Sequence, residues 1–398
     1  MKNAELVQAL HGAELPRRNF LRTSLLMAVP AALAASGMPH AVASISTSAY
    51  TPPRRARGAA TVDVRNFGAL GNGSNDDTTA FQRAIDSLPS AGGTVTIPAG
   101  NYVIDPTRKV RLRSKMHLKL ASGATLRAKR NSADRAYVLM AYKVSNVEIS
   151  GGQIIGDRDA HLGTTGEWGH GIQVLGSSRV TVRDIKVSRC WGDGVCVGGA
   201  MVANADPIPS EDVVIANIVS TGNRRHGLTI ANAHNVKVYD SEFSNSHGLA
   251  FGCGIDIEPS NSNTATNMHI ENCLIENNAS NGILVYKRVS GTAIKKCTIA
   301  RNGGYGILTI APRSGYVAQN RIRHNYLEGL MLRAGTRDYQ ASGNYFRNNK
   351  TRLHGVNTSG GRAVPMTGLV GGNRGTGAHI QKTADCVGIR VTTNYYAK

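Results

Sequence analysis

One short pattern recurs from Val180 to the C-terminal region, and this repeat constrains the fold more than any other feature of the chain. Each unit has an apolar–polar alternation, a polar corner residue, and a second alternation that begins at a glycine. Seven corner positions are Asp184, Asn217, Asp240, Asn272, Lys296, Asn320 and Gly343. They are separated by 33, 23, 32, 24, 24 and 23 residues. Alternation with a period of two predicts strands rather than helices.

A unit of this length cannot bury its apolar face alone, so successive units are expected to stack on one another. In a parallel stack, equivalent residues of neighbouring turns lie about 4.8 Å apart. Each position of the repeat then becomes a column of side chains in space. The sequence therefore predicts an all-β solenoid over residues 61–385, in which residues far apart in the chain act together.

The two ends of the chain are predicted to lie outside the solenoid. Residues 1–43 contain Arg17-Arg18, a short apolar stretch and the cleavage pattern Ala41-Val42-Ala43. This combination predicts a twin-arginine signal, periplasmic or secreted localisation, and no membrane attachment after the signal is removed. An uncleaved N-terminal anchor is the alternative. Residues 44–60 are predicted to be a basic linker and residues 386–398 a C-terminal tail.

Residues 61–104 are predicted to close the N-terminal end of the solenoid. An amphipathic helix is expected from Thr79 to Leu88, because its apolar residues recur on one face. An open solenoid end exposes strand edges and core, and a helix laid across it covers both. The repeat also places Cys273 and Cys297 in one inward column, where we expect free core thiols rather than a disulfide.

The second alternating run of each unit carries the candidate chemistry. Residues one and three positions after the glycine are apolar and predicted to point inward, so those at two and four positions are expected to face solvent. That outer face is poor in charge except at Asp256 and Glu258. The pair could bind Ca²⁺, act as an acid–base pair, or simply be solvated.

The position before the glycine forms a second column, which contains His170, Asp193 and His226. Stacking would place an imidazole about 5 Å to either side of the carboxylate. A carboxylate beside an imidazole raises its basicity and orients its tautomer, as a general acid or base requires. The structural alternative is a hydrogen-bonded ladder that closes successive turns.

Further candidate residues suggest an acidic polymer as the partner. Trp168 and Trp191 share one slot, and they could form a stacking platform for sugar rings or pack laterally under a loop. The basic candidates for substrate binding are Arg224, Arg225, Lys287 and Arg288. The formal net charge of +20 favours an acidic partner. Nucleic acid is not expected, because no binding motif is present and aromatic residues make up only 5% of the chain.

Three insertions are expected to wall the candidate site, because insertions on one side of a solenoid usually build its binding face. They are residues 156–167, 199–211 and 246–253.

The N-terminal unit resembles a known family. Val64-Arg65-Asn66-Phe67-Gly68-Ala69, Asn75-Asp76-Asp77-Thr78 and Gly92-Gly93-Thr94-Val95 closely resemble the rhamnogalacturonase/epimerase-like pectate lyase domain of the pectate-lyase superfamily. The resemblance implies a right-handed parallel β-helix with a short N-terminal capping helix. It leaves the reaction open, because this superfamily includes lyases, inverting hydrolases, mannuronan C5-epimerases and phage tailspikes, as monomers or trimers.

The family's catalytic motifs are matched in part. Gly192-Asp193-Gly194 and Arg225-His226-Gly227 resemble the N-T-D-G and G-H-G strands of the hydrolases, and Tyr286-Lys287-Arg288 resembles their R-I-K strand. The aspartate pair of those hydrolases is absent. Gly254-Ile255-Asp256-Ile257-Glu258-Pro259 resembles the epimerase segment Y-G-F-D-P-H, with Glu258 in place of the histidine.

Taken together, these features predict an exported enzyme that cleaves an acidic, uronate-bearing glycan by β-elimination. His226 or His170 would be the base, oriented by Asp193. Asp256 and Glu258 would hold Ca²⁺ or take part in acid chemistry. The alternatives are a polygalacturonase-like hydrolase, an epimerase and a non-catalytic glycan-binding protein.

Overall fold

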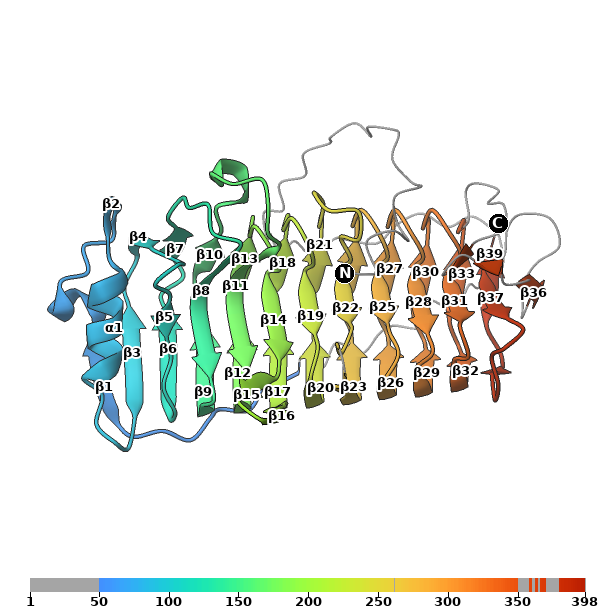
Figure 1. The fold of residues 1–398 in the computed structure, drawn as a ribbon, viewed down its shortest axis with the longest axis horizontal. Coiled ribbons are helices and arrows are strands. Elements are labelled where there is room, and N and C mark those ends of the chain that lie inside the picture. The colour runs from blue at the N-terminus through green and yellow to red at the C-terminus, as the bar shows by residue number, and fades with distance from the viewer. Residues whose placement is uncertain are drawn as a thin grey trace, which may run out of the picture. The chain divides into compact units, whose positions relative to one another are not determined.

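The computed structural model describes residues 50–260, 262–349 and 379–397, together with the backbone of β34 (Thr358–Ser359), β35 (Arg362–Ala363) and β36 (Met366–Leu369). The chain coils around one core, and the strands of successive turns lie side by side and form three long sheets (Figure 1). This confirms the all-β solenoid. Within the described residues, no helix has the length and apolar character needed to span a membrane. The predicted signal segment, residues 1–43, lies outside the described residues.

Sheet A is parallel throughout and follows the order of the chain. Its strands are β1 (Ala60–Asp63), β3 (Gly93–Ile97), β6 (Met116–Leu120), β9 (Ser145–Ser150), β12 (Ser178–Arg183), β17 (Ser210–Ala216), β20 (Ala233–Tyr239), β23 (Ala265–Glu271), β26 (Val289–Lys295), β29 (Arg313–Ala318), β32 (Arg337–Ser342) and β38 (Arg390–Val391).

Sheet B is also parallel, and from β12 to β33 each of its strands follows a sheet A strand after a two-residue corner whose first residue is left-handed. Its strands are β2 (Asn72–Asp76), β4 (Gly100–Ile104), β7 (Ala124–Ala128), β10 (Gln153–Ile155), β13 (Lys186–Ser188), β18 (Val219–Thr221), β21 (Glu242–Ser244), β24 (Leu274–Glu276), β27 (Thr298–Ala300), β30 (Arg321–Arg323), β33 (Tyr345–Arg347) and β39 (Tyr395–Ala397). The corner residue Asp184 has φ of 53° and Asn217 has φ of 52°, a conformation that Asn and Asp tolerate.

Sheet C carries the second alternating run of each unit. Its parallel strands are β5 (Val110–Arg111), β8 (Arg135–Tyr142), β11 (Trp168–Leu175), β14 (Val195–Gly198), β19 (Leu228–Ile230), β22 (Ile255–Ile257), β25 (Ile283–Val285), β28 (Ile307–Ile310), β31 (Leu330–Arg333) and β37 (Ile380–Thr383). Leu228 pairs with Ile255, so the turn begins at Gly254 as the repeat predicts. From β5 onward, the described turns run from sheet C to A to B.

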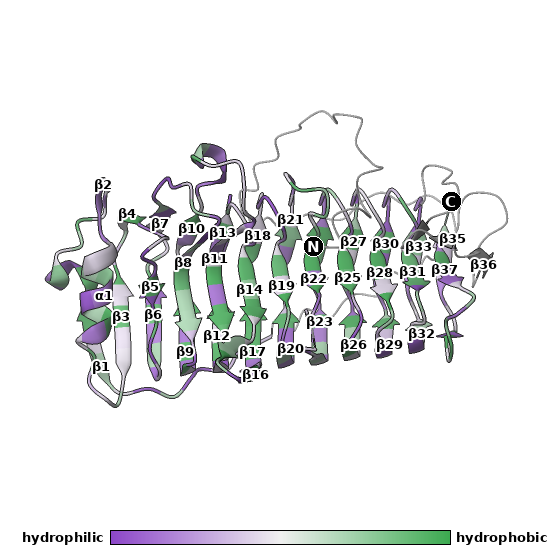
Figure 2. Ribbon diagram, viewed as in Figure 1, coloured by the Kyte–Doolittle hydropathy of each residue, from purple (hydrophilic) through white to green (hydrophobic). Residues whose placement is uncertain are grey.

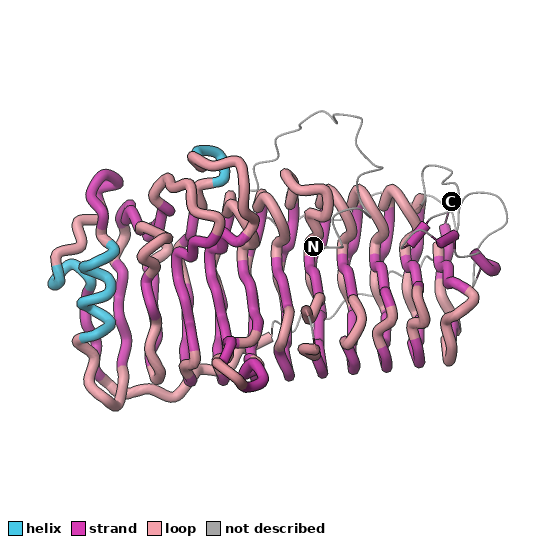
Figure 3. The backbone as a smooth tube through the Cα atoms, in the orientation of Figure 1, coloured by secondary structure: helices cyan, strands magenta, loops and turns pink. Residues whose placement is uncertain are grey.

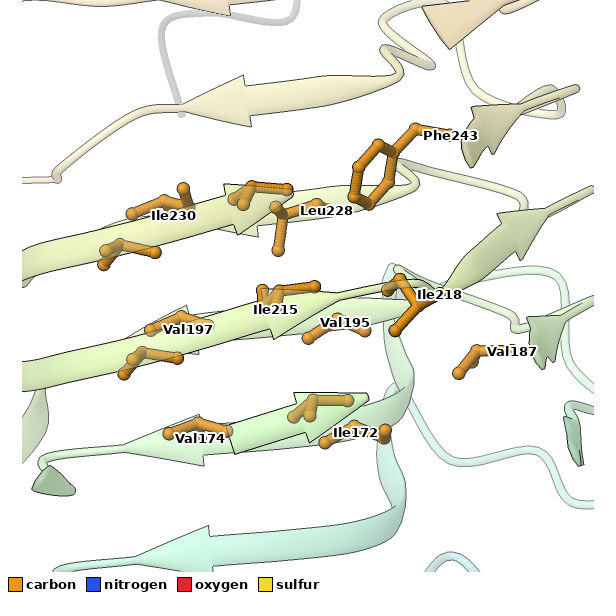
Figure 4. Packing of buried hydrophobic residues seen from close by; sticks show 14 of the residues in the cluster. Ile172, Val174, Val187, Val195, Val197, Ile215, Ile218, Leu228, Ile230 and Phe243 are labelled. Carbon is orange, nitrogen blue, oxygen red and sulfur yellow. The ribbon is translucent and has the colours of Figure 1, made fainter. Parts of the chain in front are cut away.

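The core lies between the three sheets and consists of the inward residues of each strand. In Figure 4, Ile172, Val195 and Leu228 of sheet C stack in one column and point toward the core. Figure 2 shows the apolar residues as bands along the strands. Burying one such side chain contributes about 1.5–3 kcal/mol, so the stacked turns stabilise one another. All six cysteines are free and buried, which agrees with Cys273 and Cys297 as core thiols.

The N-terminal end carries one α-helix, α1 (Thr78–Asp86), which follows the short 3₁₀ helix η1 (Val64–Phe67). Phe81, Ala84 and Ile85 of α1 are fully buried in the core cluster. Figure 3 shows this helix at one end of the strand stack.

Both predicted flanking segments contact the solenoid, and the predicted tail is part of it. From Tyr50 onward, the predicted linker 44–60 lies along sheet A, where Arg55 is buried and bonded to Thr181 and Asp212. The predicted tail 386–398 forms β38 and β39, which add a last strand to sheets A and B. Composition predicted a linker and a tail because it does not show that the polar groups of these segments bond to the strands of the solenoid.

The three insertions do not lie on one side. Residues 199–211 form the hairpin of β15 (Ala200–Val202) and β16 (Ala205–Ile208) between sheets C and A, at the lower edge in Figure 1. Residues 156–167, with the 3₁₀ helix η2 (Arg158–Ala160), and residues 246–253 lie between sheets B and C. Only these two segments can wall the starts of the sheet C strands.

Candidate functional site

The column His170–Asp193–His226 sits at the starts of three adjacent sheet C strands. The amide of Gly171 donates to the carbonyl of Asp193 (3.1 Å), and the amide of Gly194 donates to the carbonyl of His226 (3.0 Å). The three residues are therefore direct neighbours on successive turns, as the repeat predicts. All three side chains are buried.

His170 is held as a neutral ring. The backbone N–H of Asp193 donates to Nδ1 of His170 (2.9 Å), and the ring of Tyr137 stacks on it at 5.5 Å. Burial lowers the pKa of His170 to about 4, and the charge of Asp193 only partly offsets this. These contacts give His170 a structural part rather than that of the base.

Asp193 is an ionised carboxylate inside the protein. Its Oδ1 accepts from the backbone N–H of His226 (3.1 Å), and its Oδ2 lies 3.3 Å from Nη1 of Arg225. Burial alone would raise the pKa of Asp193, but the charge of Arg225 holds it below its usual range. Asp193 therefore positions Arg225 and the backbone of His226, and it does not orient the His226 ring as the sequence predicted.

The carboxylate partner of the His226 ring is Asp256. Nε2 of His226 lies 3.1 Å from Oδ2 of Asp256, although the N–H direction misses a well-aligned hydrogen bond. Burial alone would lower the pKa of His226, but the charge of Asp256 outweighs burial and raises it. The N–H of Cys253 donates to Nδ1 (3.0 Å), which keeps the proton off that atom. The geometry thus places the ring proton on Nε2, toward Asp256.

Four buried polar atoms around this pair have no hydrogen-bond partner. They are Nε of Arg225, Nε2 of His226, Oγ1 of Thr229 and Oδ1 of Asp256. Buried polar atoms in native proteins are nearly always hydrogen-bonded, so a cluster of exceptions indicates a place where a ligand supplies the partners. The cluster offers two N–H donors, one hydroxyl and one carboxylate acceptor.

Side chains from the inserted segments cover this cluster of unpartnered atoms. The ring of Phe251, from the segment 246–253, lies 5.9 Å from the ring of His226 and 6.0 Å from the guanidinium carbon of Arg225. Glu167 approaches Nε of Arg225 at 3.7 Å, and Arg158 contacts His247 at 3.2 Å. The side chains of His226 and Asp256 are consequently 1% and 3% exposed. This corrects the expectation that the residues two positions after each glycine face solvent, because Gln173, Cys196 and Thr229 are buried as well.

The tryptophans do not present an open platform. The ring of His161 stacks on Trp191 at 4.0 Å, and the guanidinium carbon of Arg224 lies 3.7 Å from the same ring. Trp168 is covered by Arg135 at 3.9 Å. The expected stacking platform is therefore corrected to lateral packing under the 156–167 segment, the alternative weighed from the sequence.

The four predicted substrate-binding cations have different surroundings. Arg224 stacks on Trp191 and donates to the carbonyl of Gly166 (2.7 Å), while Arg225 pairs with Asp193. Arg288 donates to the backbone carbonyls of Pro259 and Asn263, so it holds a loop. Lys287 is exposed at the end of β25. Only Lys287 remains as an open cation, since the guanidinium groups of the other three are engaged.

The structure pairs Asp256 with His226 rather than building a carboxylate cage with Glu258. Among the described residues, the one cluster of three His, Cys, Asp or Glu side chains close enough to share an ion is His170, Asp193 and Cys196. It contains neither Asp256 nor Glu258. Calcium binding at those two residues stays a prediction.

Sequence reasoning missed two residues of the site. Glu167 and Phe251 come from the inserted segments, where the repeat provides no register. Only their positions in the sequence could have indicated them. Glu167 lies next to Trp168, and Phe251 lies two positions before Cys253.

Two family descriptions match the chain. "Rhamnogalacturonase A/epimerase, pectate lyase-like" matches residues 61–308, which is more than half of the chain, and "Right handed beta helix region" matches residues 252–395. This agrees with the predicted resemblance and with the right-handed coil.

Proteins from Bacillus subtilis and Azotobacter vinelandii are among those similar to this chain. YclG of Bacillus subtilis is 28% identical over 279 residues, which cover 59% of this chain and 48% of YclG. Mannuronan C5-epimerase AlgE2 of Azotobacter vinelandii is 29% identical over 221 residues, which cover 48% of this chain and 22% of AlgE2. The chain thus spans about half or less of these relatives' lengths. The A-module of A. vinelandii mannuronan C-5 epimerase AlgE4 has the same fold, with a TM-score of 0.58, 19% identity, and coverage of 85% of this chain and 98% of that module.

Proposed function

The chain belongs to the rhamnogalacturonase A/epimerase, pectate-lyase-like family, and from that premise we propose that it is an exported lyase that cleaves a uronate-bearing glycan by β-elimination. The observation that carries the proposal is the set of unpartnered buried atoms on Arg225, His226 and Asp256. Two donors beside one acceptor match the needs of proton removal next to a carboxylate.

Asp256 is the base in this proposal. Its Oδ1 has no hydrogen-bond partner, whereas His226 has no free lone pair, because Nδ1 accepts from the Cys253 amide and Nε2 carries the proton that faces Asp256. Oδ1 takes the C5 proton, and the C5–H electrons form the C4–C5 double bond as the C4–O4 bond breaks. This differs from the sequence prediction, which made His226 or His170 the base.

His226 stabilises the departing O4. Its Nε2–H hydrogen-bonds to O4 as the C4–O4 bond breaks. Asp256 then delivers the proton that it took from C5 to O4, which becomes a hydroxyl. Both groups regain their starting state without a further reactant.

Arg225 stabilises the charge that develops on the substrate carboxylate. Its Nε–H is unpartnered while Nη1 is fixed on Asp193, so the guanidinium is oriented before substrate arrives. Preoriented donors in a water-poor site stabilise a transition state strongly, since no reorganisation is needed. Lys287 would bind the carboxylate of another sugar residue along the glycan.

Access requires movement of the cover. Because His226 and Asp256 are almost fully buried, the 246–253 segment with Phe251 must open before a sugar reaches Oδ1. Closure would then exclude water from the charged groups.

The test is incubation with pectate, alginate, glucuronan and bacterial exopolysaccharides, reading ultraviolet absorbance and reducing ends together. β-Elimination raises both, because each cut creates an unsaturated end. Reducing ends without absorbance would contradict the lyase and favour a hydrolase. No change on any polymer would favour a glycan-binding protein.

C5-epimerisation is the second candidate, and the similarity to AlgE2 favours it. Both reactions begin with removal of the C5 proton, and an epimerase then returns a proton to the opposite face of C5. Nuclear magnetic resonance of the polymer separates them: an epimerase changes the uronate ratio at constant chain length.

A further inference from the structure

A second group of chemically matched side chains lies on sheet B, on strands β30, β33 and β39 near the C-terminal end of the coil (Figure 1). Ile322 and Phe346 of these strands point into the core and are fully buried. Their neighbours must point outward, because side chains alternate along a strand. Arg321, Tyr345, Arg347 and Tyr395 are exposed, and Arg323 is half-buried.

The outward residues form two columns. In one, Arg321 pairs with Tyr345 and Tyr345 pairs with Tyr395. In the other, Arg323 pairs with Arg347. Paired residues on neighbouring strands lie about 4.8 Å apart, so three arginines and two tyrosines make one continuous surface.

The charge of this surface lacks a counterpart in the described part of the chain. Residues 281–349 contain eleven Lys or Arg and two Asp or Glu, whereas residues 231–280 contain one and six. None of the described carboxylates forms an ion pair with Arg321, Arg323 or Arg347. Like charges opposite one another on neighbouring strands oppose folding, so the Arg323–Arg347 pair calls for an anionic ligand.

The tyrosines narrow the class of ligand. Tyr345 and Tyr395 are 37% and 58% exposed. An exposed ring offers an apolar face to a pyranose and a hydroxyl for hydrogen bonding. A guanidinium binds a carboxylate through two parallel N–H donors. An acidic polysaccharide presents both groups, because sugar faces and carboxylates alternate along its chain.

We propose that Arg321, Arg323, Tyr345, Arg347 and Tyr395 form a second binding surface for an acidic polysaccharide, separate from the site on sheet C. The identity of this ligand as the uronate glycan rests on the proposed function. One long chain held on both sheets is bound more tightly than a short one, because the second contact is intramolecular.

The experiment measures the affinity of polygalacturonate and alginate by calorimetry in the Asp256→Asn background, with neutral dextran as the blank. Arg323→Ala/Arg347→Ala should weaken binding about ten-fold at low salt, with the difference shrinking at high salt. Arg127→Ala is the matched control: Arg127 is exposed and lies in the same column, toward the other end of sheet B. The affinity of the Arg127→Ala variant for the two polymers should lie within about two-fold of that of the Asp256→Asn protein.

The outcomes separate this surface from the proposed function. Arginine-dependent binding without turnover by the wild-type protein on any uronate polymer would overturn the function and leave the surface standing. Turnover together with unchanged affinity in the double variant, or no polymer binding at all, would overturn the surface. Equal binding of double-stranded DNA through the same arginines would overturn the polysaccharide as its ligand.

Discussion

Nε2 of His226 lies 3.1 Å from Oδ2 of Asp256, and the two residues reach this distance from adjacent turns of the coil. His226 stands before its strand, whereas Asp256 stands inside the next one. The side chains therefore converge diagonally rather than in one column. This diagonal leaves Oδ1 of Asp256 and Nε–H of Arg225 without partners beside the same ring.

Replacing Asp256 by Asn should lower turnover about 10²–10⁴-fold, because the amide keeps the shape but cannot accept the C5 proton. The measurement is the initial rate on whichever uronate polymer the wild-type protein cleaves. Glu211→Gln, at an exposed carboxylate, serves as the control and should retain the wild-type rate. An Asp256→Asn enzyme within ten-fold of wild type would remove this residue from the role of base.

Most of the scaffold was predictable because one period governs it. The columns of Ile172, Val195 and Leu228, and of His170, Asp193 and His226, follow from counting two dozen residues per turn with allowance for insertions. Register in a stacked solenoid is set by burial, since a shift of one residue would turn the apolar face outward.

The chemistry within the columns was less predictable. Whether Asp193 or Asp256 faces the His226 ring depends on side-chain rotamers and on the Cys253 amide, neither of which the repeat encodes. The sequence left open whether Trp191 is a stacking platform or packs under a loop, because Arg224 and His161 reach it from segments without periodicity. The spacing of the repeat cannot predict the side-chain contacts of inserted segments, because these segments have no period.

Replacing Asp193 by Asn should lower the free energy of unfolding by about 1–3 kcal/mol, because it leaves the largely buried Arg225 with only the more distant carboxylate of Glu167 as an ion-pair partner. Denaturant unfolding of wild type, Asp193→Asn and Asp193→Asn/Arg225→Met measures this. The double variant should recover part of the loss, since it removes the poorly paired charge. If the single variant were as stable as wild type, the ion pair would have no structural weight.

Stability should depend on pH through His170. Its pKa is about 4 in the folded protein, against an ordinary value of 6.5, so the unfolded chain binds more protons between these pH values. The contribution of the neutral His170 to the free energy of unfolding is complete above pH 6.5. It is lost as the pH falls toward 4, at up to about 1.4 kcal/mol per pH unit.

His170→Asn provides the comparison. Its amide oxygen can replace Nδ1 as acceptor of the Asp193 N–H, but it does not titrate. Burial also lowers the pKa of His117 to about 4, and His117 is present in both proteins, so the difference isolates His170. The expected result is a shallower fall in unfolding free energy from pH 6.5 to 4. Parallel curves for the two proteins would show that His170 is not the titrating group.

The segment before β1 is tied to the outside of the coil far from its own turn. Nη1 of Arg55 lies 2.6 Å from Oδ2 of Asp212, and its Nε donates to Oγ1 of Thr181 (2.8 Å). The ring of Tyr50 stacks on Tyr239 at 3.8 Å. These contacts bind one short stretch to strands β12, β17 and β20, so it bridges several turns of sheet A.

Arg55→Ala should therefore lower the free energy of unfolding by about 1–3 kcal/mol, because several buried hydrogen bonds lose their donor at once. Arg54 next to it is exposed, and Arg54→Ala should change stability by less than about 0.5 kcal/mol. Limited proteolysis should cut Arg55→Ala before β1 faster than it cuts Arg54→Ala, since a released strap is accessible while the coil stays folded. Equal stability and equal cutting of the two variants would mean that the segment rests on sheet A without bracing it.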